Sequence, residues 1–129
     1  MDVSSVRKDA RNYFQPILLG NNKTSRRLSR KIFRKHGICS LILDEKTSLA
    51  NLCLFSHRFV RITPTKDASI TLMQLAELST QLQDMLPILI PCSEKYERDI
   101  EIYRSELETV FVLSTPQDVL WESPLNIIP

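Results

Sequence analysis

The chain has 129 residues and a formal net charge of +2, with 43% hydrophobic and 25% charged residues. This length suits one compact domain, and the apolar fraction is high enough to exclude long disorder. The only two glycines, at positions 20 and 37, exclude a glycine-rich loop that cradles phosphates. The three cysteines, Cys39, Cys53 and Cys92, lie far apart without a C-x-x-C motif, so we expect reduced thiols in a cytoplasmic protein.

Apolar runs along the chain are all too short to cross a membrane, so we expect no membrane partner. The first twelve residues are polar and charged, and we therefore expect no secretory signal.

The first predicted elements are a strand and a helix. Residues 16–20 form a short aliphatic run, typical of a strand that is buried on both faces. Asn21, Asn22 and Thr24 are then candidate caps for a helix over about 25–36, and Gly37 is a natural stop for that helix. The stripe predicted to face inward consists of Ser25, Leu28, Ser29, Ile32, Phe33 and His36.

The same alternation continues to the end of the chain. Further strands are predicted at 39–43, 59–62, 86–90 and 110–113, and further helices at 47–54, 69–85 and 94–108. The predicted inner faces of the last two helices are Leu72, Leu75, Ala76, Ser79 and Leu82 in one, and Tyr96, Ile100, Tyr103 and Leu107 in the other. The segment 115–129 predicts a short helical turn and then an exit segment.

This order of elements predicts an α/β fold with three layers. Strands that alternate with helices at this spacing form a mostly parallel five-stranded sheet, with helices on both faces. Right-handed crossovers favour the Rossmann-like strand order 3-2-1-4-5. We expect the domain to span residues 13–120, between a polar N-terminal segment (1–12) and a C-terminal exit segment (121–129).

In such a sheet the chain reverses between the first and fourth strands, which leaves a crevice at their carboxyl ends. A helix N-terminus there carries a partial positive charge, so a small anion is the natural ligand. The alternative is that these residues only cap a helix. The candidate residues are Gly20, Asn21, Asn22, Lys23, Thr24 and Arg26 on one side, with Pro91, Cys92 and Ser93 on the other.

Seven basic residues crowd the helix 23–36, with no acid among them. This stripe could serve a nucleic-acid adaptor, face an acidic partner domain or only meet solvent. Nucleic acid is disfavoured, because no aromatic residues interleave with the charges and the whole chain is barely basic. The residues are Lys23, Arg26, Arg27, Arg30, Lys31, Arg34 and Lys35.

Other chemistry-bearing residues give weak signals. Asp44 and Glu45 follow the second strand, where dinucleotide-binding proteins hold a ribose hydroxyl, but the glycine fingerprint is absent. His36 and His57 stand apart, without the spacing of metal ligands. Cys92 has no neighbouring base in sequence, so a small buried residue is favoured over a nucleophile. We assign no catalytic, cofactor-binding or metal-binding residue.

The order and texture of these segments resemble the N-terminal, pre-ATP-grasp domain of ATP-grasp ligases. The most similar members are carbamoyl-phosphate-synthase-like and D-aspartate-type ligases, and the similarity covers about residues 13–120. It rests on order and spacing more than on invariant residues. The segments that carry it are 16–20, 37–44, 56–60, 89–96, 104–108 and 111–113.

The resemblance implies a Rossmann-like domain that packs against an ATP-grasp module of the same parent protein. In such ligases ATP, magnesium and most catalytic residues belong to that module, while the pre-ATP-grasp domain shapes the acceptor-substrate side of the cleft. A lysine-containing helix that leads into a Gly-Ile-Pro turn is expected after the fifth strand and is absent here. We therefore expect that this chain alone neither binds ATP in that way nor acts as an enzyme.

Two alternative functions stay open at this point, and the second is a nucleic-acid adaptor that uses the basic helix 23–36. The first is a binding module. The chain could be a stand-alone, flavodoxin-like regulatory module that binds a phosphorylated small molecule. Apolar faces meant for a missing module also promote self-association, which leaves a homodimer open.

Overall fold

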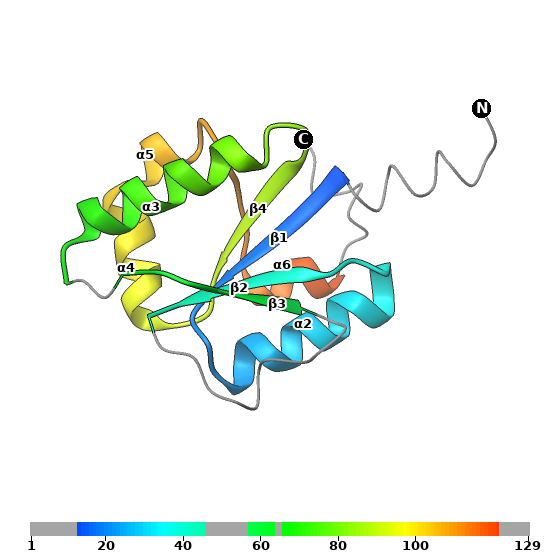
Figure 1. Cartoon of the computed structure of the whole chain (residues 1–129). Coiled ribbons are helices and arrows are strands. Elements are labelled where there is room, and N and C mark those ends of the chain that lie inside the picture. Colours follow the sequence, from blue (N-terminus) through cyan, green and yellow to red (C-terminus); the bar gives the residue numbers. More distant parts are fainter. Residues whose placement is uncertain (1–12, 46–56, 64–65, 122–129) are drawn as a thin grey trace.

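A computed structural model describes residues 13–45, 57–63 and 66–121 of the chain. Strands and helices alternate along it (Figure 1). The strands are β1 (Phe14–Leu19), β2 (Ser40–Asp44), β3 (His57–Arg61), β4 (Leu86–Pro91) and β5 (Val112–Leu113). The helices are α2 (Lys23–His36), α3 (Ala68–Gln81), α4 (Glu94–Ile102), α5 (Arg104–Leu107) and α6 (Pro116–Trp121).

The five strands form one parallel sheet in the order β3-β2-β1-β4-β5, which confirms the predicted α/β fold. The central strand β1 pairs with β4 over six residue pairs, from Phe14 with Leu86 to Leu19 with Pro91. Because β1 and β4 are parallel neighbours, their carboxyl ends lie side by side at one edge of the sheet. The direction in which successive strands are added also changes between them. That edge is where α/β proteins of this order hold ligands.

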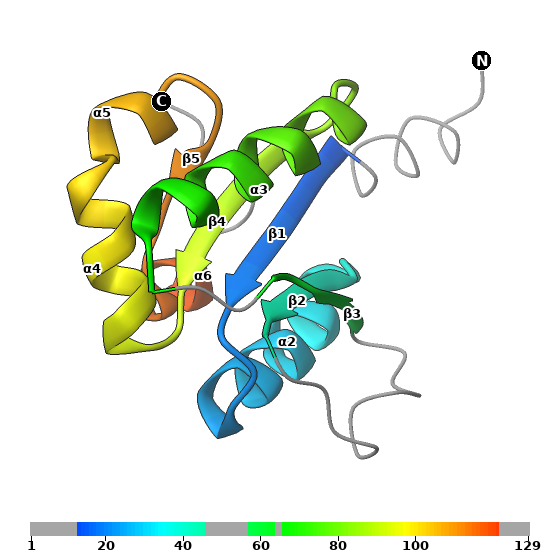
Figure 2. The same cartoon turned by 60° about the vertical axis from the view of Figure 1, so that its left-hand side comes forward.

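The sheet divides the core into two layers. Alternate residues of β1 point to opposite faces: Ile17 and Leu19 pack towards α3, α4 and α5, whereas Leu18 packs towards α2. All six residues of β1 are buried, as expected for a strand covered on both faces. Figure 2 shows α3, α4 and α5 over one face of the sheet, and α2 lies against the other.

Helix α2 packs close to the sheet because its first two inward positions carry small side chains. Ser25 and Ser29 are completely buried, and Leu28 and Ile32 fill the space around them. The helix ends at Gly37, whose φ of 69° lies in the left-handed region that glycine adopts at low cost. This confirms the predicted end of the helix.

Several predicted details are wrong. Phe33 was expected to face inward, but it is 39% exposed, because it lies at the edge of the arc that the buried residues Ser25, Leu28, Ser29 and Ile32 define. Ala76 is exposed rather than buried, and α3 ends at Gln81 instead of residue 85. The predicted helix 94–108 is divided at Tyr103, where φ is −114°. The predicted helix at 47–54 lies outside the described residues.

The remaining boundaries agree with the expected ones to within two residues, and β5 covers two residues where four were expected. Tyr96, Ile100 and Leu107 are buried on the inner side of α4 and α5, as predicted. Within the described ranges, every helix falls short of the length or the apolar character that a membrane span requires.

Candidate functional site

The turn that follows β1 forms one wall of the predicted crevice. Gly20 has a φ of 110°, in a region that residues with a side chain adopt only at a cost, and this conformation lets the chain bend from β1 towards α2. The backbone N–H groups of this turn are bonded within the chain. Gly20 N donates to Leu43 O at 2.8 Å, and Asn21 N donates to the carboxylate of Asp44 at 2.6 Å.

Asn22 joins the two walls of the crevice. Its Oδ1 accepts a hydrogen bond from Ser25 N at 2.9 Å, and its own N–H donates to Ser25 Oγ at 3.0 Å, so the pair forms a reciprocal helix cap. Its Nδ2 also donates to Cys92 O at 2.9 Å, on the turn that follows β4. One side chain therefore begins α2 and fixes the distance between the ends of β1 and β4.

The opposite wall consists of Pro91, Cys92 and Ser93. Cys92 N donates to Leu19 O at 2.8 Å, which extends the pairing of β1 and β4 by one bond. Ser93 is the N-cap of α4, and its Oγ accepts a hydrogen bond from Tyr96 N at 3.4 Å. A Cβ placed on Gly20 would lie 3.6 Å from Ser93 Oγ, at van der Waals distance, so the gap between the two turns is about the width of one methyl group.

The thiol of Cys92 is buried and is not activated as a nucleophile. Burial, with a smaller contribution from the Glu97 carboxylate, raises the pKa of Cys92 from 9.0 to about 12. The thiol therefore stays protonated at neutral pH, whereas a nucleophilic cysteine needs a lowered pKa. Its Sγ lies 3.7 Å from Ile90 O, among the apolar residues beneath α2.

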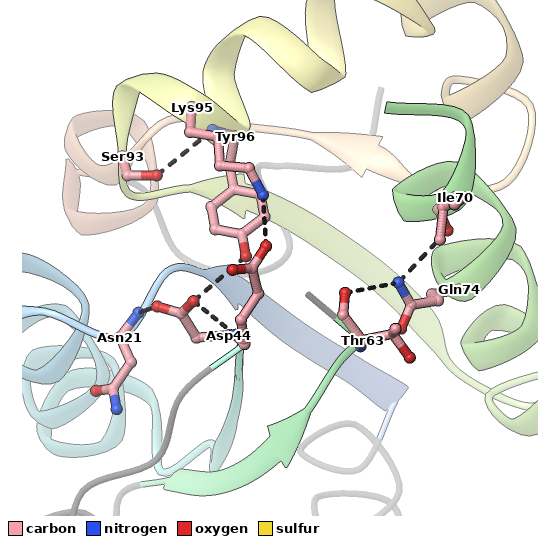
Figure 3. Close-up of polar contacts among 9 residues, drawn as sticks. Asn21, Asp44, Thr63, Ile70, Gln74, Ser93, Lys95 and Tyr96 are labelled. Carbon is pink, nitrogen blue, oxygen red and sulfur yellow. Dashed lines mark hydrogen bonds and ion pairs between the residues drawn. The ribbon is translucent and has the colours of Figure 1, made fainter. Parts of the chain in front are cut away.

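A polar cluster lies beside the turn, at the carboxyl end of β2 (Figure 3). The carboxylate of Asp44 accepts hydrogen bonds from Asn21 N at 2.6 Å, from Glu45 N at 2.6 Å and from the Tyr96 hydroxyl at 3.4 Å. Lys95 Nζ forms an ion pair with Glu45 at 2.9 Å and lies 4.7 Å from the centre of the Tyr96 ring. This cluster ties β2, α4 and the first turn together.

Asp44 and Glu45 were recognisable in the sequence as strand-end acids, but Tyr96 and Lys95 were not recognised as their partners. The available signal was a tyrosine on the inner side of a helix, because a buried phenol needs a hydrogen-bond acceptor. Burial, followed by the charges of Asp44 and Glu45, raises the pKa of Tyr96, which keeps its hydroxyl a donor.

The basic candidates lie at the start of α2. Arg26 Nη1 donates to Asn21 Oδ1 at 3.2 Å, so this guanidinium is held over the turn. Lys23 and Thr24 are exposed on the first turn of the helix. The structure thus brings Gly20, Asn21, Asn22 and Arg26 together with Cys92 and Ser93, while Lys23 and Thr24 lie at the solvent-exposed margin.

An open groove, which the sequence analysis did not predict, lies farther along the same edge. It has a volume of about 420 Å³ and runs between α4 and the turn from β5 to α6. Its charged lining includes Glu97, Glu101, Asp118 and Arg104, and the arginine is paired with Glu101 at 3.1 Å. The groove shares Pro91 with the crevice, so the two features are neighbours.

Within the part of the chain that the structure describes, no three His, Cys, Asp or Glu residues are grouped so that they could hold a metal ion. Comparisons of the chain with protein-family models, with curated proteins and with solved structures found no match.

Proposed function

We propose that this chain is a non-catalytic, Rossmann-like pre-ATP-grasp domain, which shapes the acceptor-substrate side of the cleft in an ATP-dependent carboxylate–amine ligase. The observation that carries the proposal is the convergence of the turns after β1 and β4, joined by the bond from Asn22 to Cys92. This convergence forms one firm wall at the ligand-binding edge of an α/β sheet.

The polar groups of this wall favour positioning over reaction. The Asp44 carboxylate accepts hydrogen bonds from two backbone N–H groups and from the Tyr96 hydroxyl. Asn22 uses its side chain as a cap and a bridge. The Cys92 thiol is protonated. These groups hold the shape of the cleft, and this supports a domain whose reacting groups are supplied by another module.

The same geometry argues against nucleotide binding by the turn after β1. A phosphate cradle needs free backbone N–H groups that converge on one point. Here the N–H groups of Gly20, Asn21 and Asn22 donate to Leu43 O, Asp44 and Ser25 respectively. The turn does not fit a triphosphate, so we assign ATP and magnesium to an ATP-grasp module of the same parent protein, the expected partner of this domain.

A stand-alone module that binds a small anion is the second candidate. It is favoured by the Arg26 guanidinium, which Asn21 holds above the start of α2. Among the described residues assigned to the crevice, Lys23 and Arg26 carry the positive charge, which gives this alternative a narrower basis than the first.

Reading the transcript beyond the codon for Pro129 tests the proposal directly. Continuation in frame into an ATP-grasp module would support it, and a stop codon at that point would favour the stand-alone module. Calorimetric titration of the isolated chain with ATP and magnesium should give no binding heat. An affinity in the sub-micromolar range would contradict the assignment of ATP to another module.

A substitution at the margin of the crevice then tests the site in the parent ligase. Lys23→Ala should raise KM for an anionic acceptor by about tenfold, the effect of losing roughly 1.4 kcal/mol of charge-assisted binding, while KM for ATP stays unchanged. Lys31→Ala, an exposed lysine two turns along the same helix, is the matched control. Equal effects of the two variants would show that only overall charge matters.

A further inference from the structure

All the charged residues of α2 are basic, and they lie on the side of the helix that faces away from the sheet. The helix covers 14 residues and contains no acidic residue in its first turn or elsewhere. Its buried side consists of Ser25, Leu28, Ser29 and Ile32, so the charged residues all lie on the remaining side. We call this side the basic face; it consists of Lys23, Arg26, Arg27, Arg30, Lys31, Arg34 and Lys35.

The basic face repels itself. Arg26 and Arg30 lie one turn apart, as do Arg30 and Arg34, and like charges at this spacing destabilise a helix. The ion pairs of Lys95 with Glu45 and of Arg104 with Glu101 and Glu108 lie away from this repelling row of arginines. A partner that supplies negative charge along α2 would remove the repulsion.

Charge is also segregated across the molecule. The net charge of the whole chain is only +2, which by itself indicates no preference for polyanions. However, α4 on the opposite face of the sheet contains four acidic and two basic residues, whereas α2 contains only basic ones. Such a separation attracts a polyanion to one side of a nearly neutral protein.

An aromatic side chain lies at the margin of the basic face. Phe33 is 39% exposed, although the inward stripe predicted from the sequence included it. It follows Arg30 by three positions, so the two are neighbours on the helix surface. The sequence analysis disfavoured nucleic acid partly because no aromatic residue interleaves with the charges. The exposed ring of Phe33 supplies such an aromatic residue beside them.

We propose that the basic face of α2 binds single-stranded nucleic acid without sequence preference. Lys23, Arg27, Arg30 and Arg34 form a row about 16 Å long, which contacts successive phosphates. Phe33, beside that row, offers its ring to one unstacked base, the second contact that single-strand binding surfaces use. This inference rests on α2 alone and is independent of the proposed ligase function.

A membrane surface is a poorer fit for the same charges. Basic helices that lie on a bilayer insert an apolar face among the lipids. The apolar residues of α2, Leu28 and Ile32, are 3% and 1% exposed because they pack against the sheet. Of the apolar residues of α2, Phe33 alone would remain for insertion, which favours a nucleic-acid strand over a lipid surface.

Fluorescence anisotropy with a labelled 20-nucleotide oligothymidine tests the proposal. With about four phosphates neutralised, log K should fall with log salt at a slope of about −2.8, so affinity drops about 50-fold between 50 and 200 mM salt. Micromolar binding at 50 mM salt with this slope would support the proposal. No saturable binding at 50 mM salt would overturn it.

Charge-reversal variants locate the surface. Arg27→Glu with Arg34→Glu should weaken binding at least 20-fold at 50 mM salt. Lys66→Glu with Arg98→Glu changes the net charge equally at exposed positions outside α2 and should weaken binding less than threefold. Equal losses in the two double variants would overturn the assignment to α2, and circular dichroism confirms that each variant is folded.

Phe33 variants separate base stacking from simple charge attraction. Phe33→Leu keeps an apolar side chain but has no ring, and it should weaken binding to oligothymidine about tenfold, while Phe33→Tyr should bind like the unchanged protein. Heparin, which has charge but no bases, should bind equally to all three proteins. If Phe33→Leu binds oligothymidine normally, or if phosphatidylserine vesicles bind more tightly than oligothymidine, the proposal fails.

Discussion

Single residues at the carboxyl edge of the sheet each perform two tasks. Asn22 caps α2 and also bridges to Cys92 O, and Asp44 fixes both the turn after β1 and the hydroxyl of Tyr96. A side chain with two such roles cannot be replaced without moving both partners. Through these bonds, the walls of the crevice are tied to each other although they are turns rather than regular elements.

Burial of Cys92 should make the free energy of unfolding fall as the pH rises above 9. Its pKa rises from 9.0 to about 12 on folding, so the unfolded chain releases the proton first. The contribution to stability is therefore complete below pH 9 and is lost as the pH rises from 9 to 12. At pH 10.5 this thiol should cost about 2 kcal/mol of unfolding free energy relative to pH 8.

Urea unfolding at pH 8 and pH 10.5, with a reductant present, measures this loss. Cys92→Ala should be less stable at pH 8 because it leaves a small cavity, yet its stability should decline less steeply with pH. Tyr96 adds a loss of the same sign in both proteins, since its pKa is also raised by burial. Parallel declines in the two proteins would show that Cys92 is not the group responsible.

At the scale of elements, α2 illustrates what a sequence pattern can and cannot predict. Its Asn22 cap, its Gly37 end and four of its inward residues follow from local spacing and residue type. The position of Phe33 does not, because the period places it at the border between the two sides of the helix. Close contact of Ser29 with the sheet then leaves no room there for a large ring.

The division between α4 and α5 also lacks a local signal. Residues 94–108 contain no glycine or proline, and the apolar period continues through Tyr103 to Leu107. Both Tyr103 and Leu107 pack on the same core cluster as Ile100. The break thus follows from how this stretch fits over the sheet, which single-sequence patterns do not contain.

The small residues beneath α2 predict a sharp response to added volume. Ser29 is completely buried, and its Oγ lies 3.3 Å from Nδ1 of His57 on β3. Ser29→Leu should push the helix from the sheet and lower the unfolding free energy by about 1–3 kcal/mol. Arg30→Leu places the same side chain on the exposed side and should change stability by less than about 0.5 kcal/mol.

Urea denaturation of both variants measures the difference. A leucine tolerated at position 29 without loss would mean that α2 does not lie as close to the sheet as described. Because the substitution removes a polar contact with His57 as well, Ser29→Ala provides the baseline from which the effect of volume is counted.

At the scale of the whole molecule, the sequence predicted the strand order, because buried parallel strands are continuous aliphatic runs and crossovers have a fixed hand. It also placed the two turns of the crevice on facing sides. It could not supply the bonds between them, since Asn22 and Cys92 are 70 positions apart and Asp44 and Tyr96 are 52 positions apart. Such contacts depend on how far each turn extends beyond its strand.

The strand order also determines which parts of the molecule open last. The interior positions Leu18 and Ile90 of β1 and β4 are completely buried, whereas β3 lies at the edge with Arg58 exposed. Amide exchange should therefore be slowest in β1 and β4, at rates that approach global unfolding. Amides of β3 and β5 should exchange faster by a factor on the order of 100, through local opening at the edges.

Hydrogen–deuterium exchange followed by NMR resolves these strands individually. The comparison is between Leu18 and Ile90 at the centre and Val60 and Leu113 at the edges, all under conditions where the chain is folded. The central pair supports both turns of the crevice, so slow exchange there would mean that the wall stays intact while the edges open. Equal protection in all four would indicate that the sheet unfolds as one unit, and the edges would then not be its weakest parts.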